Sequence, residues 1–414
     1  MKNKKSNKEA SLFNKVLVPL DSSANSNSGM KMAIELAKKY EALLVGTHVY
    51  AARLHEDRFK QMESGLPPQY QQEDELERQR DIHNVLIDKG LQLIADSYFS
   101  TFAKECQEAG IKVSGKNLEG KNFAEIAKET NNGDYDLVVM GFLGLGAVEH
   151  SIVGTVCERV LRQIRTDCLV VKEDRPLGGD ILVAIDGSPS SYWGIKVAIS
   201  IQEAFGGEIE AVSVFDPHFH QVAFKSIADI LSSDAKNVFK FEEQEALHDE
   251  IIDKGLAKIY QEHLDRAAKL AEMNGAKIKT NLLAGKPYNE IIKHLRWKKY
   301  SLLITGRHGI HTPELDLGGN TENLLRMAPC NMYISSREYE LPEEFFKRPE
   351  SQVEWEDKTV TRLDKVPFFA RGMAKKAIED FAQERGIKKV TEEVFSDAVK
   401  KLLPPSARRS MGIE

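Results

Sequence analysis

Residues 137–156 read LVVMGFLGLGAVEHSIVGTV, and this stretch decides how the chain is expected to fold. Its first four residues, Leu137–Met140, are apolar, as expected for a strand that is buried on both faces of a sheet. Gly141 and Gly144 then interrupt the apolar run, and a helix is predicted over about 153–163. A strand, a glycine-containing loop and a helix in this order are typical of α/β proteins, which bind ligands beyond the carboxyl ends of their strands.

The same pattern occurs a second time, because residues 302–321 read LLITGRHGIHTPELDLGGNT. The peptide IDKGL occurs at 87–91 and again at 252–256, a separation of 165 positions. The same separation relates these further pairs: Asp21 and Asp186, Val49 and Val214, Gly120 and Gly285, Gly141 and Gly306, Gly144 and Gly309, and Gly154 and Gly319. One register over so long a stretch predicts a duplicated globular domain, because solenoid repeats have periods of only about 20–50 residues.

Each repeat is predicted to alternate strands with helices. The strands expected in the first repeat cover 16–20, 43–50, 111–118, 137–140 and 168–171, with helices over 30–39, 82–107, 123–128 and 153–163. The strands expected in the second repeat cover 181–185, 209–215, 278–283, 302–305 and 331–335. This order predicts an α/β fold of two tandem doubly wound domains, each with a five-stranded parallel sheet. The two domains are expected to pack together as a pseudo-dimer within the chain.

The glycine-containing loops are candidates for phosphate binding. Glycine lets the backbone approach a ligand closely, and the last glycine precedes a helix whose free N–H groups favour an anion. Neither repeat contains GxxxxGK[ST], and neither has GxGxxG after its first strand, so a P-loop ATPase and a dinucleotide oxidoreductase are not expected. Two structural interpretations remain open. The glycines would permit a tight turn, and the Asp after the first strand would cap a helix.

At these residues the sequence resembles the universal stress protein family, over about residues 12–338. The family pattern is Gly-x2-Gly-x9-Gly-(Ser/Thr) after strand four, with an Asp ending strand one and a Val ending strand two. The resemblance implies an adenine nucleotide in each domain, ATP or AMP, with Mg²⁺ possible beside ATP. It implies nucleotide contacts from Asp21, Val49, Met140, Gly141, Gly144, Gly154, Thr155 and Val156 in the first repeat, and from Asp186, Val214, Gly306, Arg307, Gly309, Gly319, Asn320 and Thr321 in the second.

Within that resemblance, each residue type has an implied role. The two Asp residues would contact ribose or adenine, the two Val residues would hold the adenine through their backbone, and the glycines and Thr155 would hold phosphates. Asn320 stands where the family has a hydroxyl, and Ser22-Ser23 stands where Gly-Ser is usual. Arg307 and His308 would either hold a phosphate or form a solvated pair. These departures leave open whether both repeats bind a nucleotide.

Three functions are compatible with this pattern. The leading hypothesis is a nucleotide-binding regulator whose partner affinity depends on the nucleotide. The alternatives are a slow ATPase and a scaffold with vestigial pockets. No positioned general base or arginine finger of the kind that fast phosphoryl transfer uses is evident, and no catalytic residue is expected. The charged stretches 55–82 and 242–262 are interpreted as solvated helix or a lid. His218-x-His220 is a weak metal candidate, because no third ligand lies nearby in the sequence.

The C-terminal part has a different character. Residues 355–403 resemble the helical module at the C-terminus of the light-independent protochlorophyllide reductase B subunit, on Trp355, Arg362-Leu363, VPFFARG at 366–372, Glu379 and Val390-Thr391. The catalytic body of that enzyme is absent, so the resemblance implies a module that docks a protein partner. The predicted organisation is a tail (1–11), domains at 12–174 and 178–338, a linker (339–354), the helical module (355–403) and a second tail (404–414).

Composition limits the remaining possibilities. The chain has 414 residues, of which 42% are hydrophobic and 29% charged, with a net charge of −6. These values suit globular domains and argue against general nucleic-acid binding. The longest weakly polar run, 137–148, is shorter than the roughly 18 residues of a membrane span, and no secretory signal is expected at the N-terminus. The four cysteines form no CxxC pair, which favours a reducing cytoplasm. A homodimer remains possible.

Overall fold

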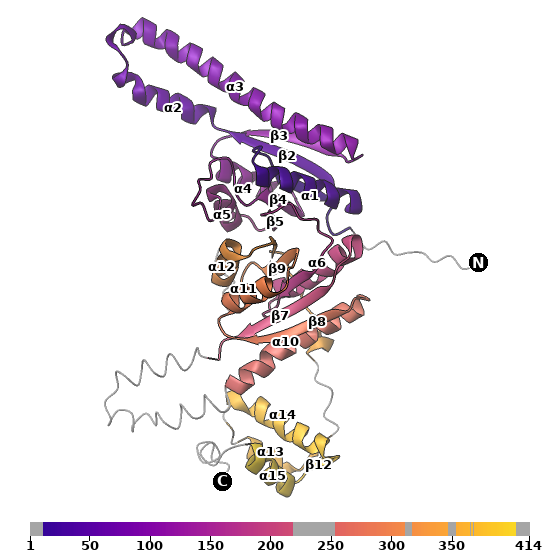
Figure 1. Cartoon of the computed structure of the whole chain (residues 1–414). Coiled ribbons are helices and arrows are strands. Elements are labelled where there is room, and N and C mark those ends of the chain that lie inside the picture. The colour runs from indigo at the N-terminus through magenta and orange to yellow at the C-terminus, as the bar shows by residue number, and fades with distance from the viewer. Residues whose placement is uncertain are drawn as a thin grey trace, which may run out of the picture. The chain divides into compact units, whose positions relative to one another are not determined.

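The computed structural model describes residues 11–217, 253–310, 317–346, 353–364, 366 and 368–402 (Figure 1). Residues 1–10 and 404–414 of the expected tails and residues 347–352 of the expected linker lie outside the described residues. So do His218, His220 and residues 242–252 of the second charged stretch.

The first repeat begins with a strand and a helix and alternates thereafter. Its elements are β1 (Lys15–Pro19), α1 (Ala24–Tyr40), β2 (Leu43–Tyr50), α2 (Ala52–Met62), α3 (Glu73–Glu108), β3 (Val113–Glu119), α4 (Asn122–Asn132), β4 (Leu137–Gly141), α5 (Thr155–Gln163) and β5 (Asp167–Val171). Two short 3-10 turns, η1 (Glu63–Gly65) and η2 (Pro68–Tyr70), join α2 to α3.

The second repeat follows the same order. Its elements are β6 (Ile181–Ala184), α6 (Pro189–Phe205), β7 (Ile209–Phe215), α10 (Asp253–Met273), β8 (Ile278–Ala284), α11 (Pro287–Trp297), β9 (Leu302–Gly306), α12 (Gly319–Met327) and β10 (Asn331–Ser335). The apolar runs that predicted strands therefore form strands in both repeats, and the predicted α/β fold class is confirmed.

The strands of both repeats join in one sheet of ten strands, in the order β3-β2-β1-β4-β5-β10-β9-β6-β7-β8. Within a repeat the described pairings are parallel, as the buried apolar strands predict. The chain moves from β1 through β2 to β3, then crosses to β4 and β5. Right-handed crossovers therefore place α1 and α3 on one face of the sheet and α4 and α5 on the other. The direction in which successive strands are added reverses between β1 and β4, and folds of this kind bind ligands at such a switch point.

Helix α3 is longer than predicted, because it begins at Glu73 instead of about residue 82. Glu73, Asp74 and Glu75 occupy its first turn, where carboxylates stabilise the positive end of the helix dipole. Its N-terminal half forms an arm with α2 that extends beyond the sheet (Figure 1). The first charged stretch is therefore a helical hairpin.

The two repeats meet at β5 and β10, which pair antiparallel. Asp167 begins β5 and Asn331 begins β10, so the two residues are equivalent. The Asp167 carboxylate accepts the backbone N–H groups of Ser336 (2.7 Å) and Arg337 (2.9 Å). The Asn331 side-chain oxygen accepts those of Lys172 (2.8 Å) and Glu173 (3.1 Å). The sequence predicted that the domains associate, and this pairing shows which edge strands join them.

Helices α5 and α12 also meet across this junction through four charged side chains. Glu158 and Arg162 of α5 are equivalent to Glu322 and Arg326 of α12. Arg162 pairs with Glu322 (2.9 Å) and Arg326 pairs with Glu158 (2.8 Å), besides the i,i+4 pair inside each helix. Such a network holds each charge between two partners, which makes it more effective than isolated surface pairs.

The C-terminal residues form a unit with its own core. Its elements are η4 (Glu343–Phe345), β11 (Glu354–Trp355), α13 (Asp357–Leu363), α14 (Phe368–Glu384), β12 (Lys389–Val390) and α15 (Glu392–Leu402). Strands β11 and β12 pair in parallel, and the buried side chains include Leu363, Phe381 and Phe395. The indole N–H of Trp355 donates to Glu379 at 2.9 Å, so two residues of the predicted module contact each other.

All four cysteines are free thiols with buried side chains. Burial raises the pKa of Cys157 to about 12 and that of Cys330 to about 11, so neither is a thiolate near neutral pH. Over the described residues, no helix is long and apolar enough to cross a bilayer.

Candidate functional site

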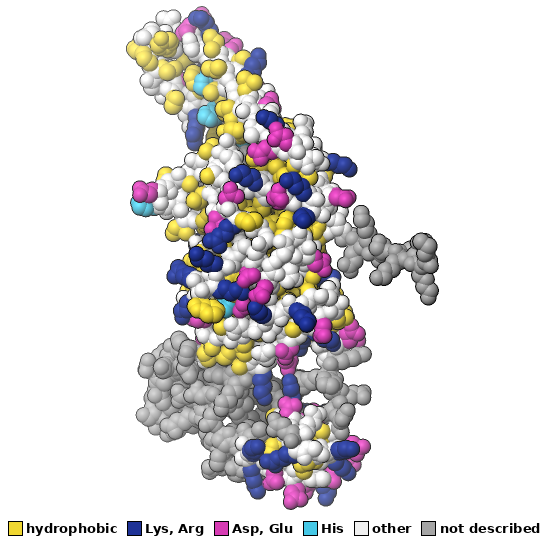
Figure 2. Space-filling view, turned by 45° about the vertical axis from the view of Figure 1, so that its right-hand side comes forward, with side chains coloured by type: hydrophobic (Ala, Val, Ile, Leu, Met, Phe, Trp, Pro, Cys, Tyr) yellow, Lys and Arg dark blue, Asp and Glu magenta, His cyan; other side chains and the backbone are white. Residues whose placement is uncertain are grey.

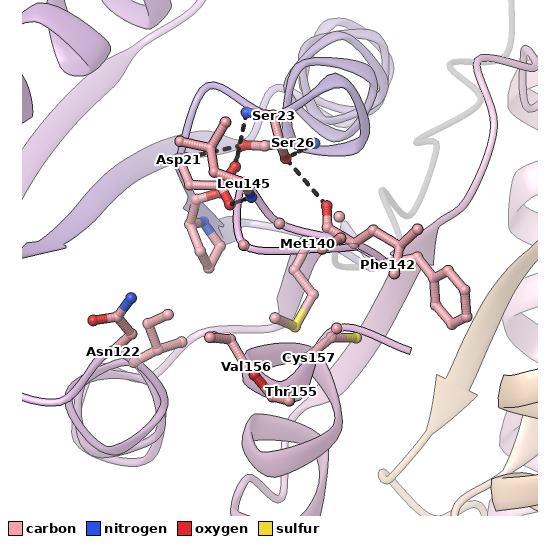
Figure 3. Close-up of a pocket in the computed structure, with 18 of the residues that line it drawn as sticks. Asp21, Ser23, Ser26, Asn122, Met140, Phe142, Leu145, Thr155, Val156 and Cys157 are labelled. Carbon is pink, nitrogen blue, oxygen red and sulfur yellow. Dashed lines mark hydrogen bonds between the residues drawn. The ribbon is translucent and has the colours of Figure 1, made fainter. Parts of the chain in front are cut away.

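A cavity of about 360 Å³ lies at the carboxyl ends of the strands of the first repeat. It is bounded by the ends of β1 and β2, by the loop after β4 and by the N-termini of α4 and α5. In Figure 3, Asp21 and Leu145 lie on one side of it, and Thr155 and Val156 lie on the other. All eight residues predicted for the first repeat line it: Asp21, Val49, Met140, Gly141, Gly144, Gly154, Thr155 and Val156.

Asp21 is not the cap of a helix, which removes one of the two structural interpretations. The N-cap of α1 is Ser23, whose hydroxyl accepts the N–H of Ser26. The Asp21 carboxylate instead accepts the N–H of Ser23 through Oδ1 (2.9 Å) and that of Leu145 through Oδ2 (3.3 Å). Because each carboxylate oxygen has two lone pairs, Asp21 keeps acceptor capacity on both oxygens.

The loop glycines are required by close packing. The structural interpretation that they permit a tight turn therefore holds. A Cβ at Gly141 would lie 2.7 Å from the N of Ser26, and one at Gly144 would lie 2.6 Å from the Asp21 carboxylate. A Cβ at Gly154 would lie 2.7 Å from the carbonyl oxygen of Phe142. These glycines let the loop approach α1 and Asp21, and they shape the cavity whether or not it holds a ligand.

Helix α5 begins at the cavity without a side-chain cap. Its N-cap is Gly154, which provides no side-chain capping hydrogen bond. The first hydrogen bond of the helix runs from the N–H of Glu158 to the carbonyl oxygen of Gly154, at 3.0 Å. The N–H groups of Thr155, Val156 and Cys157 precede it, and all three residues line the cavity. Uncapped N–H groups at a helix N-terminus bind anions, and the hydroxyl of Thr155 adds a donor.

The backbone of Val49 faces the cavity because β1 ends before β2 does. The carbonyl of Thr47 accepts the N–H of Leu20 at 2.7 Å, so Thr47 presents its peptide groups to the β1 side. Along a parallel ladder, every second residue faces the same neighbour. Val49 therefore presents its N–H and C=O to the same side, beyond the end of β1 at Pro19. This places one donor and one acceptor next to each other at the cavity wall.

His48 and Asn122 also line the cavity, although the sequence patterns did not predict them. The Nδ1 atom of His48 lies 2.6 Å from the carbonyl oxygen of Leu20, and its ring packs edge-on against Tyr98. Asn122 is the first residue of α4, and its carboxamide stands at the edge of the cavity (Figure 3). A rule that extends the site to the N-terminus of every helix at this edge of the sheet would have found Asn122.

None of the residues that line the cavity is Lys or Arg, and Asp21 is its single carboxylate. Any phosphate held here would therefore depend on backbone N–H groups and hydroxyls. Across the part of the chain that the structure describes, no cluster of three His, Cys, Asp or Glu residues is arranged to hold a metal ion.

The second repeat contains an equivalent arrangement. Ser188 caps α6, and Asp186 accepts the N–H of Ile310 at 3.2 Å, as Asp21 accepts that of Leu145. Asp186 differs in that its Oδ1 also accepts the Ser188 hydroxyl at 2.6 Å. Val214 lies in β7 and is buried, at the position equivalent to Val49. Residues 311–316, in the loop that would close this site, lie outside the described residues.

The structure corrects the predicted alignment of the two loops by one residue. The N–H of Gly154 donates to Phe142, whereas the N–H that donates to the equivalent Arg307 is that of Gly318, also at 2.9 Å. Gly318 is the N-cap of α12, so it corresponds to Gly154 in place of Gly319. The loop of the second repeat is one residue shorter, and two adjacent glycines hid this in the sequence. Gly319, not Asn320, therefore replaces the hydroxyl of Thr155.

The side chains of two further residues predicted to bind nucleotide make contacts within the protein instead. The guanidinium of Arg307 is buried, and it donates to the Ser336 hydroxyl (2.8 Å) and to the carbonyl of Leu161 at the end of α5. Both predicted roles of the Arg307 side chain, a phosphate contact and a solvated pair with His308, are therefore wrong, because the buried guanidinium binds the junction between the repeats. The hydroxyl of Thr321 donates to the carbonyl of Gly306 at 2.7 Å.

A corresponding contact runs in the other direction across the junction. Lys172 donates to the carbonyls of Leu325 (2.6 Å) and Ala328 (2.7 Å) at the end of α12, where a cation stabilises the helix dipole. Burial lowers the pKa of Lys172 to about 8. Each repeat thus places one cation on the carboxyl end of the other repeat's last helix.

The model of the universal stress protein family matches residues 12–172 and again residues 179–335. The chain belongs to the universal stress protein family. This confirms the resemblance that the loops and strand ends predicted. A universal stress protein of Methanocaldococcus jannaschii is 27% identical over 164 residues, which cover 40% of this chain and 85% of that protein. A universal stress protein of Mycobacterium bovis is 24% identical over 136 residues, 32% of this chain and 42% of that one.

A crystal structure of a universal stress protein from Archaeoglobus fulgidus matches 78% of this chain and 98% of its own, with a TM-score of 0.51 and 16% identity. At that identity the likeness shows the fold alone. The match covers more of the chain than one repeat, so this tandem universal stress protein shares its α/β fold with a solved structure.

The C-terminal resemblance is also confirmed. The model of the proto-chlorophyllide reductase 57 kD subunit matches residues 355–398. The B subunit of the light-independent protochlorophyllide reductase of Rhodospirillum rubrum is 44% identical over 50 residues, which are 12% of this chain and 9% of that protein. The match therefore covers a short helical segment of this chain.

Proposed function

We propose that the first repeat of this universal stress protein binds an adenine nucleotide, ATP or AMP, and that the chain is a cytoplasmic nucleotide-dependent regulator. One observation carries the proposal. A single cavity combines a carboxylate that retains acceptor capacity, a strand end that presents a backbone donor and acceptor, and an uncapped helix N-terminus. Its volume of about 360 Å³ lies within the range of small-molecule sites.

The groups that line the cavity match the parts of an adenine nucleotide. The N–H and C=O of Val49 suit the adjacent acceptor and donor at the edge of adenine. The Asp21 carboxylate suits ribose hydroxyls, because both of its oxygens retain lone pairs. The N–H groups of Thr155 and Val156 and the Thr155 hydroxyl suit a phosphate. With ATP, a Mg²⁺ ion would take its ligands chiefly from phosphates and water.

The first repeat is the stronger site of the two. Asp186 already accepts three hydrogen bonds, two of them on Oδ1, and therefore has less capacity left for a ligand than Asp21. Gly319 replaces Thr155 and removes one donor from the phosphate position. We infer that the second repeat binds nucleotide more weakly.

The test is to denature the purified protein and to identify and count the released nucleotide by chromatography and mass spectrometry. We expect about one ATP or AMP per chain, and calorimetry of the emptied protein should show ATP binding again. A protein that releases no nucleotide and does not bind added ATP would contradict the proposal and favour a scaffold. Accumulation of ADP from bound ATP would instead show a slow ATPase.

We also propose that the helical module, residues 355–403, docks a protein partner, because it has its own core and resembles a segment that makes up 9% of a larger protein. Affinity capture with the full chain, and with a chain that ends at residue 352, tests this. We expect the shorter chain to lose a partner while its ATP affinity stays within about twofold. Capture of the same proteins by both chains would contradict the proposal.

A further inference from the structure

We propose that two copies of this chain associate through α3, with the two helices antiparallel and related by a twofold axis near residues 87–88. The starting observation is a stripe of exposed apolar side chains on this helix. The stripe consists of Ile82, Val85, Leu86 and Leu93, which are 50, 55, 67 and 69% exposed. Together with Asp81, Lys89 and Gly90 they line a shallow groove. Figure 2 shows hydrophobic side chains exposed on the arm formed by α2 and α3.

The stripe is not part of the core of its own chain. Helix α3 packs on the sheet through Ala95, Phe102 and Cys106, which are fully buried. A second face contacts α2, where His83 stacks on Phe59 (4.3 Å) and Arg80 pairs with Glu63 (2.6 Å). With 3.6 residues per turn, the stripe lies on a third face, roughly opposite the face that packs on the sheet. An uncovered stripe of this kind marks an interaction surface.

Gly90 gives a second, independent indication of a partner. It lies within a helix of 36 residues, and a Cβ added there would meet nothing within 4 Å. Glycine inside a helix is destabilising relative to alanine, because it loses more backbone entropy on folding. Packing within the chain does not require it, whereas a neighbouring helix that approaches the groove closely would.

A second copy fits the stripe because residues 78–96 of two antiparallel helices place apolar side chains opposite apolar ones and opposite charges close together. Antiparallel pairing about residues 87–88 places Ile82 opposite Leu93 of the second copy, Val85 opposite Gly90, and Leu86 opposite the aliphatic stem of Lys89. It also brings Arg78, which is 68% exposed, close to Asp96 of the second copy at both ends of the stripe. Parallel pairing would instead place like charges together at Arg78, Asp81 and Lys89, which is destabilising. Isologous contacts of this kind are the commonest in homo-oligomers.

The contact is small, so a weak association is expected. The part of α3 over residues 75–97 is about 34 Å long. A helix pair of this length buries on the order of 1,000 Å² in total, at the low end of specific interfaces. We therefore expect a dissociation constant in the micromolar range. This interface is separate from the junction of β5 with β10, which lies within one chain.

Sedimentation of the full chain over about 1–100 µM tests the proposal. We expect a concentration-dependent dimer of twice the chain mass, and we expect Leu86→Glu to weaken it at least about tenfold. The matched control is Ile259→Glu on α10, the equivalent helix of the second repeat, where Ile259 is 45% exposed. This control should dimerise like the unchanged chain. A wild-type chain that stays monomeric throughout, or a dimer insensitive to Leu86→Glu, would overturn the proposal.

A charge reversal tests the antiparallel arrangement separately from hydrophobic association. Arg78→Asp and Asp96→Arg should each weaken the dimer about three- to tenfold, and the double variant should restore it. Dimerisation that the double variant fails to restore, although each single variant has weakened it, would exclude the antiparallel pairing. Circular dichroism of each variant checks that α3 remains folded.

Discussion

The Asp21→Ala variant is expected to bind ATP at the first repeat at least about thirtyfold more weakly than the unchanged chain. Hydrogen bonds to a charged group contribute about 1.5–3 kcal/mol each, and about 2 kcal/mol corresponds to thirtyfold. Asp21 would supply such bonds to the ribose. It also accepts the N–H of Leu145, and this bond holds the loop after β4 over the cavity. The substitution removes both effects.

Asp186→Ala is the matched control, because Asp186 holds the N–H of Ile310 in the same way in the second repeat. We expect the Asp186 variant to keep the nucleotide that purifies with the protein, and the Asp21 variant to lose it. Calorimetry with ATP and the count of released nucleotide measure both. Equal losses in the two variants would contradict the assignment of the main site to the first repeat. An Asp21 variant that is folded and binds ATP normally would contradict the role of Asp21.

Substitution of the loop glycines would be a less selective test. A Cβ at Gly154 would collide with the backbone of Phe142, and one at Gly141 would collide with the start of α1. Such variants would move the loop whether or not a nucleotide binds, so lost binding would not identify a contact. Asp21 has no such steric role, because alanine in its place removes atoms and adds none.

The Asp167→Ala variant is expected to lower the free energy of unfolding of the joined repeats by about 3–5 kcal/mol, the range for removing one member of a buried ion pair. Asp167 is fully buried. Its carboxylate accepts five hydrogen bonds, from Trp193 (2.8 Å), Tyr333 (2.7 Å), the N–H groups of Ser336 (2.7 Å) and Arg337 (2.9 Å), and the Arg337 side chain (3.1 Å). Alanine would leave these donors without an acceptor.

Urea unfolding followed by fluorescence measures this loss, with Asn331→Ala as the control. Asn331 occupies the equivalent position, but it is neutral and accepts only two backbone N–H groups through its side-chain oxygen. We expect the Asn331 variant to lose about 1–2 kcal/mol. If both variants lost the same free energy, the charge and the side-chain donors at Asp167 would not be what stabilises the junction.

The strands followed from short-range patterns in the sequence. Apolar runs such as Val16–Leu20 and Leu137–Met140 predicted buried strands, because a parallel strand covered on both faces must be apolar throughout. The site followed from topology, since the ends of β1, β2 and β4 meet at one edge of the sheet. Asp21, Val49 and Thr155 are 134 residues apart at most, yet all three line one cavity.

The wrong predictions concern residues for which the sequence offers several chemically similar contacts. Gly318 and Gly319 are adjacent, and only the hydrogen bond to Arg307 shows which of them begins the helix. Arg307 follows a loop glycine, so its position suggested a phosphate, but the end of α5 is within its reach in the folded chain. The apolar residues of α3 have helical spacing whether the face is buried or exposed, so the pattern alone did not distinguish the core from the stripe.

The sequence by itself determined that this chain contains two copies of one α/β domain and a helical module, because periodicity, strand composition and loop chemistry are local properties of the chain. Tertiary structure decided which edge strands join the repeats, where the guanidinium of Arg307 lies, and which face of α3 stays uncovered. These features depend on contacts between residues far apart in the sequence. Each of these residues has many chemically similar potential partners in the sequence, and the packing of the whole domain determines which of them it contacts.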